Sequence, residues 1–592
     1  MELSEILYQQ TNDILKRLAG LCGCSGATRK DDLVRCIHKA VMTPTSLERL
    51  WAKLDNLSKK AVAAAYHNDG EFNATAFAAQ YGSLPERPQS QWSWEAKPIL
   101  LDLFLYSPLP RQAFNVYNPI IPSDLMPLLA KLVPPPDKFQ VVGSRAAPKT
   151  VVGRYRKPVD LICVETEQVG LHDVVAYLRL VNEGKITTDY ASGRATLASI
   201  KHIVASLLQN DFLPLPEKYR ANQTIRPFGL DVFAQESGLV KTGAKNRLQL
   251  TSTGQKFYQT QTAEILLEAF ETWTCEGSFD ELSRISAIKG QKSRSTFITT
   301  PSSRREAIVE ALSWCPAGVW IDLEEFYRAV KIWHFDFEVE KTAYSSLYVG
   351  SKEYGELYGE IYWPVVKGSY IKVVLWEYLG SIGALDLLYT YPEDAPLKAK
   401  LPFFDEFFSP YDGLKYFRIN PLGAYLLGQA GEYLPSKPLY QPLFTISADL
   451  VVTLTNPAEL TPNNLSYLEQ MAAPIGNGCY RLDTQRLLTS LEEGQDLDHL
   501  ANFLQKRHAG SLSPEVLAWL EQIKENSQAF RKAENALFIQ AKSADLVELA
   551  LADPILQKIC YSIDKKTIVI PANKEKVLRA RLKELEYILQ GD

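Results

Sequence analysis

Hydrophobic residues recur at three- and four-residue intervals along most of this chain, which is the period of an α-helix with one buried face. Such stripes run through 47–57, 171–181, 196–208 and 323–330. Between the stripes lie short runs of branched and aromatic residues, such as Lys415–Ile419, which suit a pleated strand better than a helix. The pattern predicts a mainly α fold with small β-sheets, in the α+β class.

The segment 440–592 carries the most regular pattern. Runs at 443–446 and 450–454 predict two strands, and helical stripes follow them. Ser513-Pro514-Glu515 combines an N-cap residue, a proline at the first helical position and an early acid, so a helix is predicted to begin there. We therefore expect this segment to form a domain of its own.

Five short motifs are spaced through this segment. They are Arg481-Leu482-Asp483, Leu491-Glu492-Glu493-Gly494, Leu512-Ser513-Pro514-Glu515-Val516, Leu551-Ala552-Asp553-Pro554 and Leu585-Glu586-Tyr587-Ile588-Leu589. In this order they resemble the helicase-associated domain at the N-terminus of XPB-type DNA helicases and in bacterial proteins related to them, and 77–85 resembles the same bacterial proteins. Each motif is a packing or capping motif, so the resemblance implies a fold and a helicase partner rather than a reaction.

The N-terminal segment, predicted as a helical domain over 1–133, opens with two short helices joined by the turn Gly23–Gly26. This arrangement resembles the SAP-type helix pair that rests on the DNA backbone. The resemblance implies phosphate contacts from the basic residues near the turn, which are Lys16, Arg17, Arg29, Lys30 and Arg35. A capped helical hairpin with solvated charges has the same pattern, and this alternative stays open.

A basic turn, 241–247, separates two apolar runs in the segment 150–275 and is followed by a helix start. This order resembles the wing of a winged-helix domain, in which the helix before the wing enters the major groove and the wing lies along the backbone. We take the helix at 196–208 as that helix. The resemblance then implies DNA contacts from Lys241, Lys245 and Arg247 of the wing and from Arg194, Lys201 and His202 at the helix.

The tract from Ser286 to Arg305 is rich in serine and threonine and contains basic residues without one acid. This composition predicts a flexible loop that binds phosphate, and it is equally typical of solvated surface. The basic residues of the tract are Lys289, Lys292, Arg294, Arg304 and Arg305.

A second unit is predicted over 300–435. Its strand Lys415–Ile419 runs into Asn420–Gly423 and a helix, which repeats the strand, turn and helix of Leu248–Phe257. We therefore interpret 150–275 and 300–435 as tandem winged-helix units. Acids are dense in the second unit, which favours a protein partner over DNA there. They are Asp322, Glu324, Glu325, Asp336, Glu338 and Glu340.

Length and charge set limits on these interpretations. A chain of 592 residues is too long for one hydrophobic core, and Pro134-Pro135-Pro136 marks a connector between domains. No apolar run reaches the ~18 residues that span a bilayer, and the start lacks the pattern of a signal peptide, so we expect a cytoplasmic protein with no membrane partner. The net charge of -5 excludes a uniformly basic surface but permits local basic patches.

Four possible metal ligands, Cys22, Cys24, Cys36 and His38, lie close together in the sequence. Zinc sites usually separate paired ligands by two or more residues, whereas one residue separates the first pair here. The eight cysteines do not form a disulfide framework either. We expect buried thiols, no metal and no cofactor.

Catalytic motifs are absent from the sequence. No G-x-x-x-x-G-K-[ST] phosphate loop occurs, since Ala244 stands where the lysine is required after Gly238 and Gly243, and no G-x-S-x-G motif occurs. We expect a non-catalytic DNA-binding adaptor that partners an XPB-like superfamily 2 helicase, in DNA repair or in defence against foreign DNA. Two alternatives stay open, a winged-helix transcription regulator and the nuclease subunit of a helicase-nuclease complex.

Overall fold

The computed structural model describes residues 1–24, 26–87, 97–107, 118–293, 297–341, 346–396, 407–435, 442–457, 460, 462–492, 494–529 and 535–590. Contacts divide the chain into two compact units, Met1–Gln441 with Thr461–Asn463, and Pro442–Leu460 with Asn464–Asp592. Helices and small antiparallel sheets alternate in both units, which confirms the α+β expectation. Within the described ranges, no helix has the length and apolar character that crossing a membrane requires.

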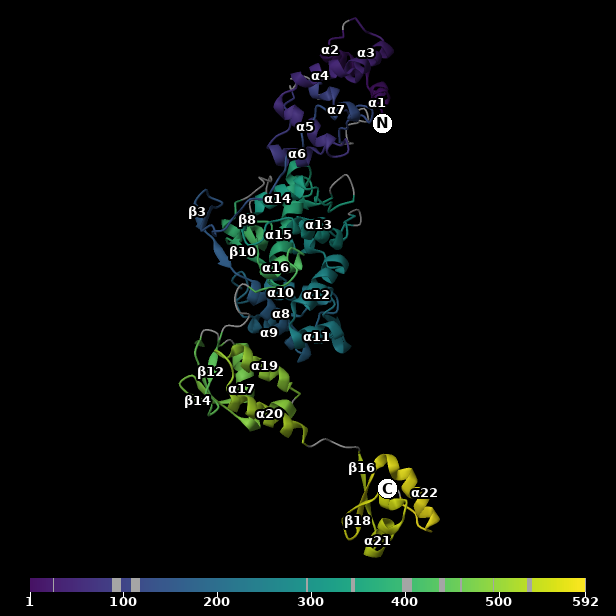
Figure 1. Cartoon of the computed structure of the whole chain (residues 1–592), viewed down its shortest axis with the longest axis vertical. Coiled ribbons are helices and arrows are strands. Elements are labelled where there is room, and N and C mark those ends of the chain that lie inside the picture. Colours follow the sequence, from purple (N-terminus) through teal and green to yellow (C-terminus); the bar gives the residue numbers. More distant parts are fainter. Residues whose placement is uncertain are drawn as a thin grey trace. The chain divides into compact units, whose positions relative to one another are not determined.

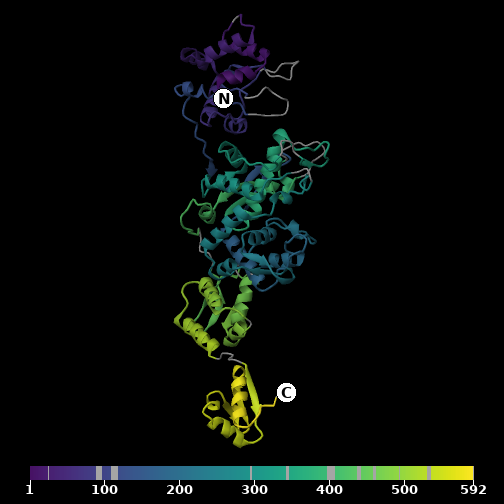
Figure 2. The same ribbon diagram turned by 90° about the vertical axis from the view of Figure 1, so that its right-hand side faces the viewer.

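The first unit begins with a group of helices, drawn in purple to blue in Figure 2. They are α1 (Leu3–Gln9), α2 (Asn12–Leu21), α3 (Lys30–Met42), α4 (Pro44–Lys53), α5 (Asn56–Tyr66), α6 (Ala74–Tyr81) and α7 (Met126–Leu129). Their apolar stripes meet in one core around Leu15, Ile37 and Leu50. A disulfide joins Cys24 to Cys36, so the expectation of free thiols is wrong for these two cysteines.

The next part of this unit contains one order of elements twice. The first copy comprises α8 (Glu167–Asn182), the extended residues 186–188, α9 (Leu197–Ser206), α10 (Arg226–Glu236), the hairpin β5 (Val240–Thr242) and β6 (Leu248–Leu250), and α11 (Ser252–Thr260). α12 (Ala263–Glu276) follows. The second copy comprises α13 (Pro301–Ser313), β8 (Trp320–Asp322), α14 (Leu323–Ile332), the helical run η6 (Trp363–Lys367), α15 (Gly368–Val373) and η7 (Val374–Gly380), the strands β10 (Leu385–Tyr389) and β11 (Leu414–Ile419), and α16 (Pro421–Leu426).

The turn after each hairpin shows the same local chemistry in both copies. Thr251 Oγ1 accepts a hydrogen bond from Gly254 N at 3.1 Å, and Asn420 Oδ1 accepts one from Gly423 N at 3.0 Å. A Cβ atom at either glycine would overlap the carbonyl oxygen of the residue just before its hairpin. Glycine is therefore required at both positions, and the repeated strand, turn and helix noted in the sequence are present in the structure.

The two copies share one hydrophobic core. It includes Val174 and Trp273 from the first copy and α12, and Trp376 and Leu422 from the second. The segments predicted as separate domains, 150–275 and 300–435, are thus packed as one body. Strands β1 (Gly143–Ser144) and β4 (Ile162–Val164) complete a five-stranded antiparallel sheet in the order β1-β8-β11-β10-β4. Two short antiparallel pairs, β2 (Thr150–Val152) with β3 (Pro158–Asp160) and β7 (Ile288–Lys289) with β9 (Tyr348–Val349), lie outside this sheet.

The second unit contains two hydrophobic cores, although the sequence predicted one closed domain over 440–592. The first core, around Phe444, Leu468 and Leu504, is built by β12 (Phe444–Ile446), β13 (Val451–Leu454), α17 (Pro462–Met471), β14 (Ala472–Gly476), β15 (Cys479–Leu482), α18 (Thr484–Glu492), α19 (Leu497–Arg507) and α20 (Pro514–Gln528). The other core, around Val547 and Leu578, is built by β16 (Ala536–Gln540), α21 (Ala544–Ala552), β17 (Tyr561–Asp564), β18 (Thr567–Pro571) and α22 (Glu575–Glu584). The predicted strands at 443–446 and 450–454 and the helix that begins after Ser513 are confirmed.

Candidate nucleic-acid interface

The hairpin β5–β6 presents three positive charges to solvent. Its strands pair from Val240 with Leu250 to Thr242 with Leu248. Lys245 and Asn246 at the tip have φ values of 56° and 55°, in the left-handed region, so the chain reverses tightly there. Lys241, Lys245 and Arg247 are exposed, and none of them forms an ion pair within the described residues. Three uncompensated cations on one narrow hairpin are suited to phosphate oxygens.

An exposed tyrosine lies in the loop that begins beside this tip. Thr188 N donates a hydrogen bond to Asn246 O at 2.8 Å, which holds the extended residues 186–188 against the hairpin. Two residues further on, Tyr190 is 91% exposed. Its hydroxyl is of the kind that donates to a phosphate. The sequence did not predict Tyr190, because the predicted contacts were chosen by their charge. Whether an uncharged aromatic residue is exposed is decided by tertiary packing.

Of the three residues predicted to contact DNA from α9 and its start, two are exposed and one is engaged inside the protein. Lys201 and His202 are exposed on α9. The guanidinium of Arg194 donates to Glu236 Oε1 at 2.5 Å and lies 4.9 Å from the centre of the Phe279 ring. Because this side chain is engaged inside the protein and only 18% exposed, the prediction that it contacts DNA is corrected.

The helix immediately before the hairpin is α10, not the helix at 196–208 as predicted. Every residue of α10 from Arg226 to Ala234 is buried. A Cβ atom at Gly229 would overlap the carbonyl oxygen of Glu377, so α10 packs directly against η7. In Figure 1 α10 lies among α8, α9 and α12. The helix that would read base edges in a winged-helix protein is therefore covered by the second copy of the repeat.

Arg284 links the buried Glu377 of η7 to α10, because its guanidinium lies 4.0 Å from the centre of the Phe228 ring. Glu377 accepts hydrogen bonds from Arg284 Nε at 2.9 Å and Arg284 Nη2 at 2.8 Å, and from the Tyr411 hydroxyl. Burial raises the pKa of Glu377 from its ordinary value to about 7, although the Arg284 charge opposes this shift. On the first copy, Arg226 at the start of α10 lies 3.4 Å from Asp173.

Only part of the basic tract 286–305 lies at the protein surface. Lys289 and Lys292 are exposed, and Arg294 lies outside the described residues. The prediction of a flexible loop is wrong from Pro301 onward, where α13 begins.

Arg304 and Arg305 are fully buried on α13. Arg304 pairs with Asp280 at 2.9 Å, and Arg305 pairs with Glu281 at 2.6 Å and donates to Trp273 O at 2.8 Å. Since a buried guanidinium that is paired inside the core cannot reach a phosphate, both residues are removed from the predicted interface.

The basic residues that the N-terminal resemblance assigns to phosphate contacts lie around the turn between α2 and α3. Lys16, Arg17, Arg29 and Arg35 are exposed, and Lys30 is partly so. Asp31 and Asp32 also lie in the first turn of α3, and Arg35 is 3.7 Å from Asp32. This surface is of mixed charge, unlike the hairpin tip, so both the SAP-like interpretation and the solvated hairpin stay open.

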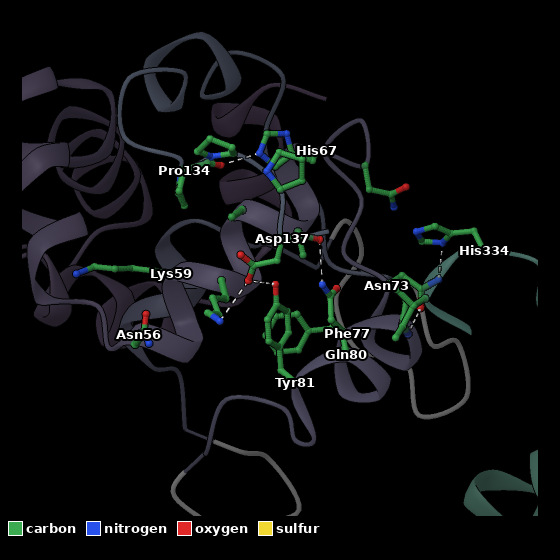
Figure 3. Close-up of a pocket in the computed structure, with 18 of the residues that line it drawn as sticks. Asn56, Lys59, His67, Asn73, Phe77, Gln80, Tyr81, Pro134, Asp137 and His334 are labelled. Atoms are coloured by element: carbon green, nitrogen blue, oxygen red, sulfur yellow. Dashed lines mark hydrogen bonds and ion pairs between the residues drawn. The ribbon is translucent and has the colours of Figure 1, made fainter. Parts of the chain in front are cut away.

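A polar pocket of about 510 Å³ lies where α5 and α6 meet the connector and α14 (Figure 3). Asp137 accepts from the Tyr81 hydroxyl at 2.9 Å and pairs with Lys60 at 3.2 Å, and these partners lower the pKa of Asp137. His67 Nε2 lies 2.8 Å from Pro134 O. These polar contacts hold the connector against α5 and α6. The predicted domain boundary at Pro134–Pro136 is therefore bound to the helices by hydrogen bonds and an ion pair.

The two strands predicted from 443 to 454 could offer a free edge to a protein partner, and the structure shows which edges of their sheet are open. The edge of β12 is occupied, because Leu443 N donates to Arg507 O and Ala509 N donates to Phe444 O, both at 2.8 Å. The opposite edge of the sheet is β14, where Ile475 is exposed. The sequence also predicts an acidic side from Glu492, Glu493, Asp496 and Asp498. Glu492, Asp496 and Asp498 are exposed on or beside α18 and α19, and Glu493 lies outside the described residues.

No group of three or more histidine, cysteine, aspartate or glutamate side chains within the described ranges is arranged to hold a metal ion. Comparison of the chain with protein-family models and with curated proteins finds no match. A function is therefore to be inferred from the geometry of the exposed cations and of the helix beside them.

Proposed function

We propose that this protein is a non-catalytic DNA-binding accessory subunit that holds duplex DNA by its phosphates and partners an XPB-like superfamily 2 helicase. In this proposal the two repeats are winged-helix units and β5–β6 is a wing. The observation that carries it is the wing tip, where Lys241, Lys245 and Arg247 are exposed without an acidic partner among the described residues. Phosphate contacts of this kind supply affinity without sequence information.

The burial of α10 favours this function over a transcription regulator. A winged-helix regulator reads bases with the helix before its wing. Here that helix is buried from Arg226 to Ala234 and packs on η7. Binding through the wing, with Lys201 and His202 of α9 as further contacts, leaves base edges unread, so we expect little sequence preference.

We propose that the helicase docks on the part of the second unit built by β12 to α20. Glu492, Asp496 and Asp498 give this part an acidic surface, which disfavours DNA and suits a protein. The edge strand β14 offers backbone groups to a partner strand. The setting we propose is DNA repair or defence against foreign DNA.

The wing is tested by charge reversal in the full-length protein. Lys241→Glu combined with Lys245→Glu is expected to lower the affinity for a duplex at least tenfold at low salt. It should also reduce the slope of log affinity against log salt by about 2, because each lost phosphate contact contributes ~0.9. Fluorescence anisotropy with a labelled duplex, over a salt series, measures both quantities.

The matched control is Lys138→Glu combined with Lys352→Glu, which makes the same charge change at exposed positions outside the interface. It should bind as the wild type does, apart from a small uniform loss. If both double variants lose affinity equally, net charge rather than the wing governs binding, and the proposed interface is wrong.

A further inference from the structure

The last sheet of the chain has one covered face and one open face. Its order is β16-β18-β17, with antiparallel pairing throughout. Leu537, Ile539, Ile568 and Ile570 point to the face covered by α21 and α22, where they join the core around Val547 and Leu578. Figure 1 shows both helices on one side of the strands. Alternate residues along each strand must therefore face away from the helices.

The open face carries a row of large side chains across the three strands. The register pairs Val569 of β18 with Phe538 of β16 on one side and with Tyr561 of β17 on the other. Phe538 is 72% exposed and Tyr561 is 64% exposed. Two exposed aromatic rings on one sheet face, with only the central strand between them, are costly to leave in water unless they serve an interaction.

One end of this face is basic. Ala541 N donates to Lys566 O at 2.7 Å, so the residues after β16 lie beside the turn between β17 and β18. Lys542, Lys565 and Lys566 are exposed there, and none of them forms an ion pair within the described residues. The nearby Asp564 carboxylate accepts the Lys566 backbone N–H at 2.7 Å and fixes the turn. Aromatic rings and free lysines thus meet on one surface.

We propose that this face binds single-stranded nucleic acid. Bases stack on the rings of Phe538 and Tyr561, with Val569 as an apolar contact between them, and phosphates reach Lys542, Lys565 and Lys566. Stacking on aromatic side chains of a sheet, with cations along the backbone path, is a general way to hold unpaired bases. A duplex does not fit this surface, because its bases are paired and stacked on one another. The site therefore goes beyond the proposed duplex binding and uses other residues.

The test measures the affinity of the full-length protein for a labelled oligo-dT strand and for a duplex. Phe538→Ala combined with Tyr561→Ala is expected to weaken binding of the strand at least tenfold and to leave duplex binding unchanged. Tyr587→Ala, an exposed tyrosine on the segment after α22, is the matched aromatic control and should bind both ligands as the wild type does. A 2-aminopurine base in the strand should change its fluorescence with the wild type and not with the double variant, because stacking alters its emission.

The lysines give a second, independent variant. Lys565→Glu combined with Lys566→Glu is expected to reduce the salt dependence of strand binding while 2-aminopurine stacking persists at low salt. Equal strand affinity of wild type and Phe538→Ala/Tyr561→Ala would overturn the proposal, as would a wild type that does not bind the strand. Light scattering gives one more outcome. If the wild type is a dimer and Phe538→Ala/Tyr561→Ala is a monomer with the same strand affinity, the proposal is also overturned, and the face binds a second copy of this chain. Since the wing variants are read out on duplex DNA, failure of either proposal is recognised separately.

Discussion

Buried charges decide which basic residues of this protein can meet a ligand. Arg194, Arg304 and Arg305 each have an acidic partner inside the first unit, Glu236, Asp280 and Glu281 respectively. Lys241 and Lys245 have none among the described residues. Removing one member of a buried pair leaves an uncompensated charge, which is strongly destabilising, so the paired arginines are constrained by folding. The two lysines have no such buried partner in the described part of the chain, so only solubility and binding limit which residues can replace them.

Glu377 gives the first unit a pH-dependent stability. Its pKa is about 7 in the folded protein and near 4.5 in the unfolded chain. Below pH 4.5 both states are protonated, and between pH 4.5 and 7 only the folded state holds the proton, so stability falls as pH rises and is constant above 7. At about 1.4 kcal/mol for each pKa unit, the loss is about 3 kcal/mol.

Urea unfolding at pH 5 and pH 8, for the wild type and for Glu377→Gln, measures this effect. Glutamine keeps the shape and still accepts from Arg284, but it does not titrate. The wild type is expected to lose about 2–3 kcal/mol more than the variant between the two pH values. An equal loss in both proteins would show that Glu377 does not carry the pH dependence.

At the level of elements, the contact of α10 with η7 keeps the helix before the β5–β6 hairpin away from solvent. α10 has no solvent-exposed face from Arg226 to Ala234, because its own copy of the repeat and the second copy cover it. Such a helix has no periodic stripe, which explains why the sequence did not predict it. Its tight approach to η7 depends on the glycine at position 229.

Gly229→Ala tests that approach. Alanine in a helix interior is ordinarily more favourable than glycine by up to about 1 kcal/mol. Here the added methyl group would overlap the Glu377 carbonyl oxygen, so we expect a net destabilisation of about 1–3 kcal/mol, as for other overpacked sites. Thermal or urea unfolding followed by circular dichroism measures it.

Gly20→Ala in α2 is the control, because no atom lies within 4 Å of a Cβ built at Gly20. This variant should be unchanged or slightly stabilised. A Gly229→Ala protein as stable as Gly20→Ala would mean that α10 has room to move away from η7.

At the level of the whole molecule, the chain divides into two compact units. The second compact unit begins at Pro442, and the predicted boundary was at 440. The first unit contains the wing, and the second contains the acidic surface and the aromatic sheet face. The proposed duplex binding and the proposed helicase docking are therefore separable by truncation.

Fragments 1–435 and 442–592 are expected to fold independently, because none of the hydrophobic cores formed by the described residues spans both. Fragment 1–435 should keep the duplex affinity and lose the association with an XPB-like helicase in a pull-down, while 442–592 keeps that association. Circular dichroism on each fragment checks folding. Duplex affinity carried by 442–592, or a helicase retained by 1–435, would contradict this division.

The sequence by itself determined the features that depend on neighbours along the chain. The hairpin of β5 and β6, the Thr251 and Asn420 turns and the helix start at Ser513-Pro514 were predictable, because caps and tight turns are satisfied within a few residues. The tertiary structure decided the rest. The partners of Arg194 and Arg305 lie 42 and 24 residues away, the cover of α10 comes from the other repeat, and the edge of β12 is closed by residues near 508. Burial and charge pairing are set by segments that meet only in the folded chain, so a run of basic residues cannot show which of its members remain exposed.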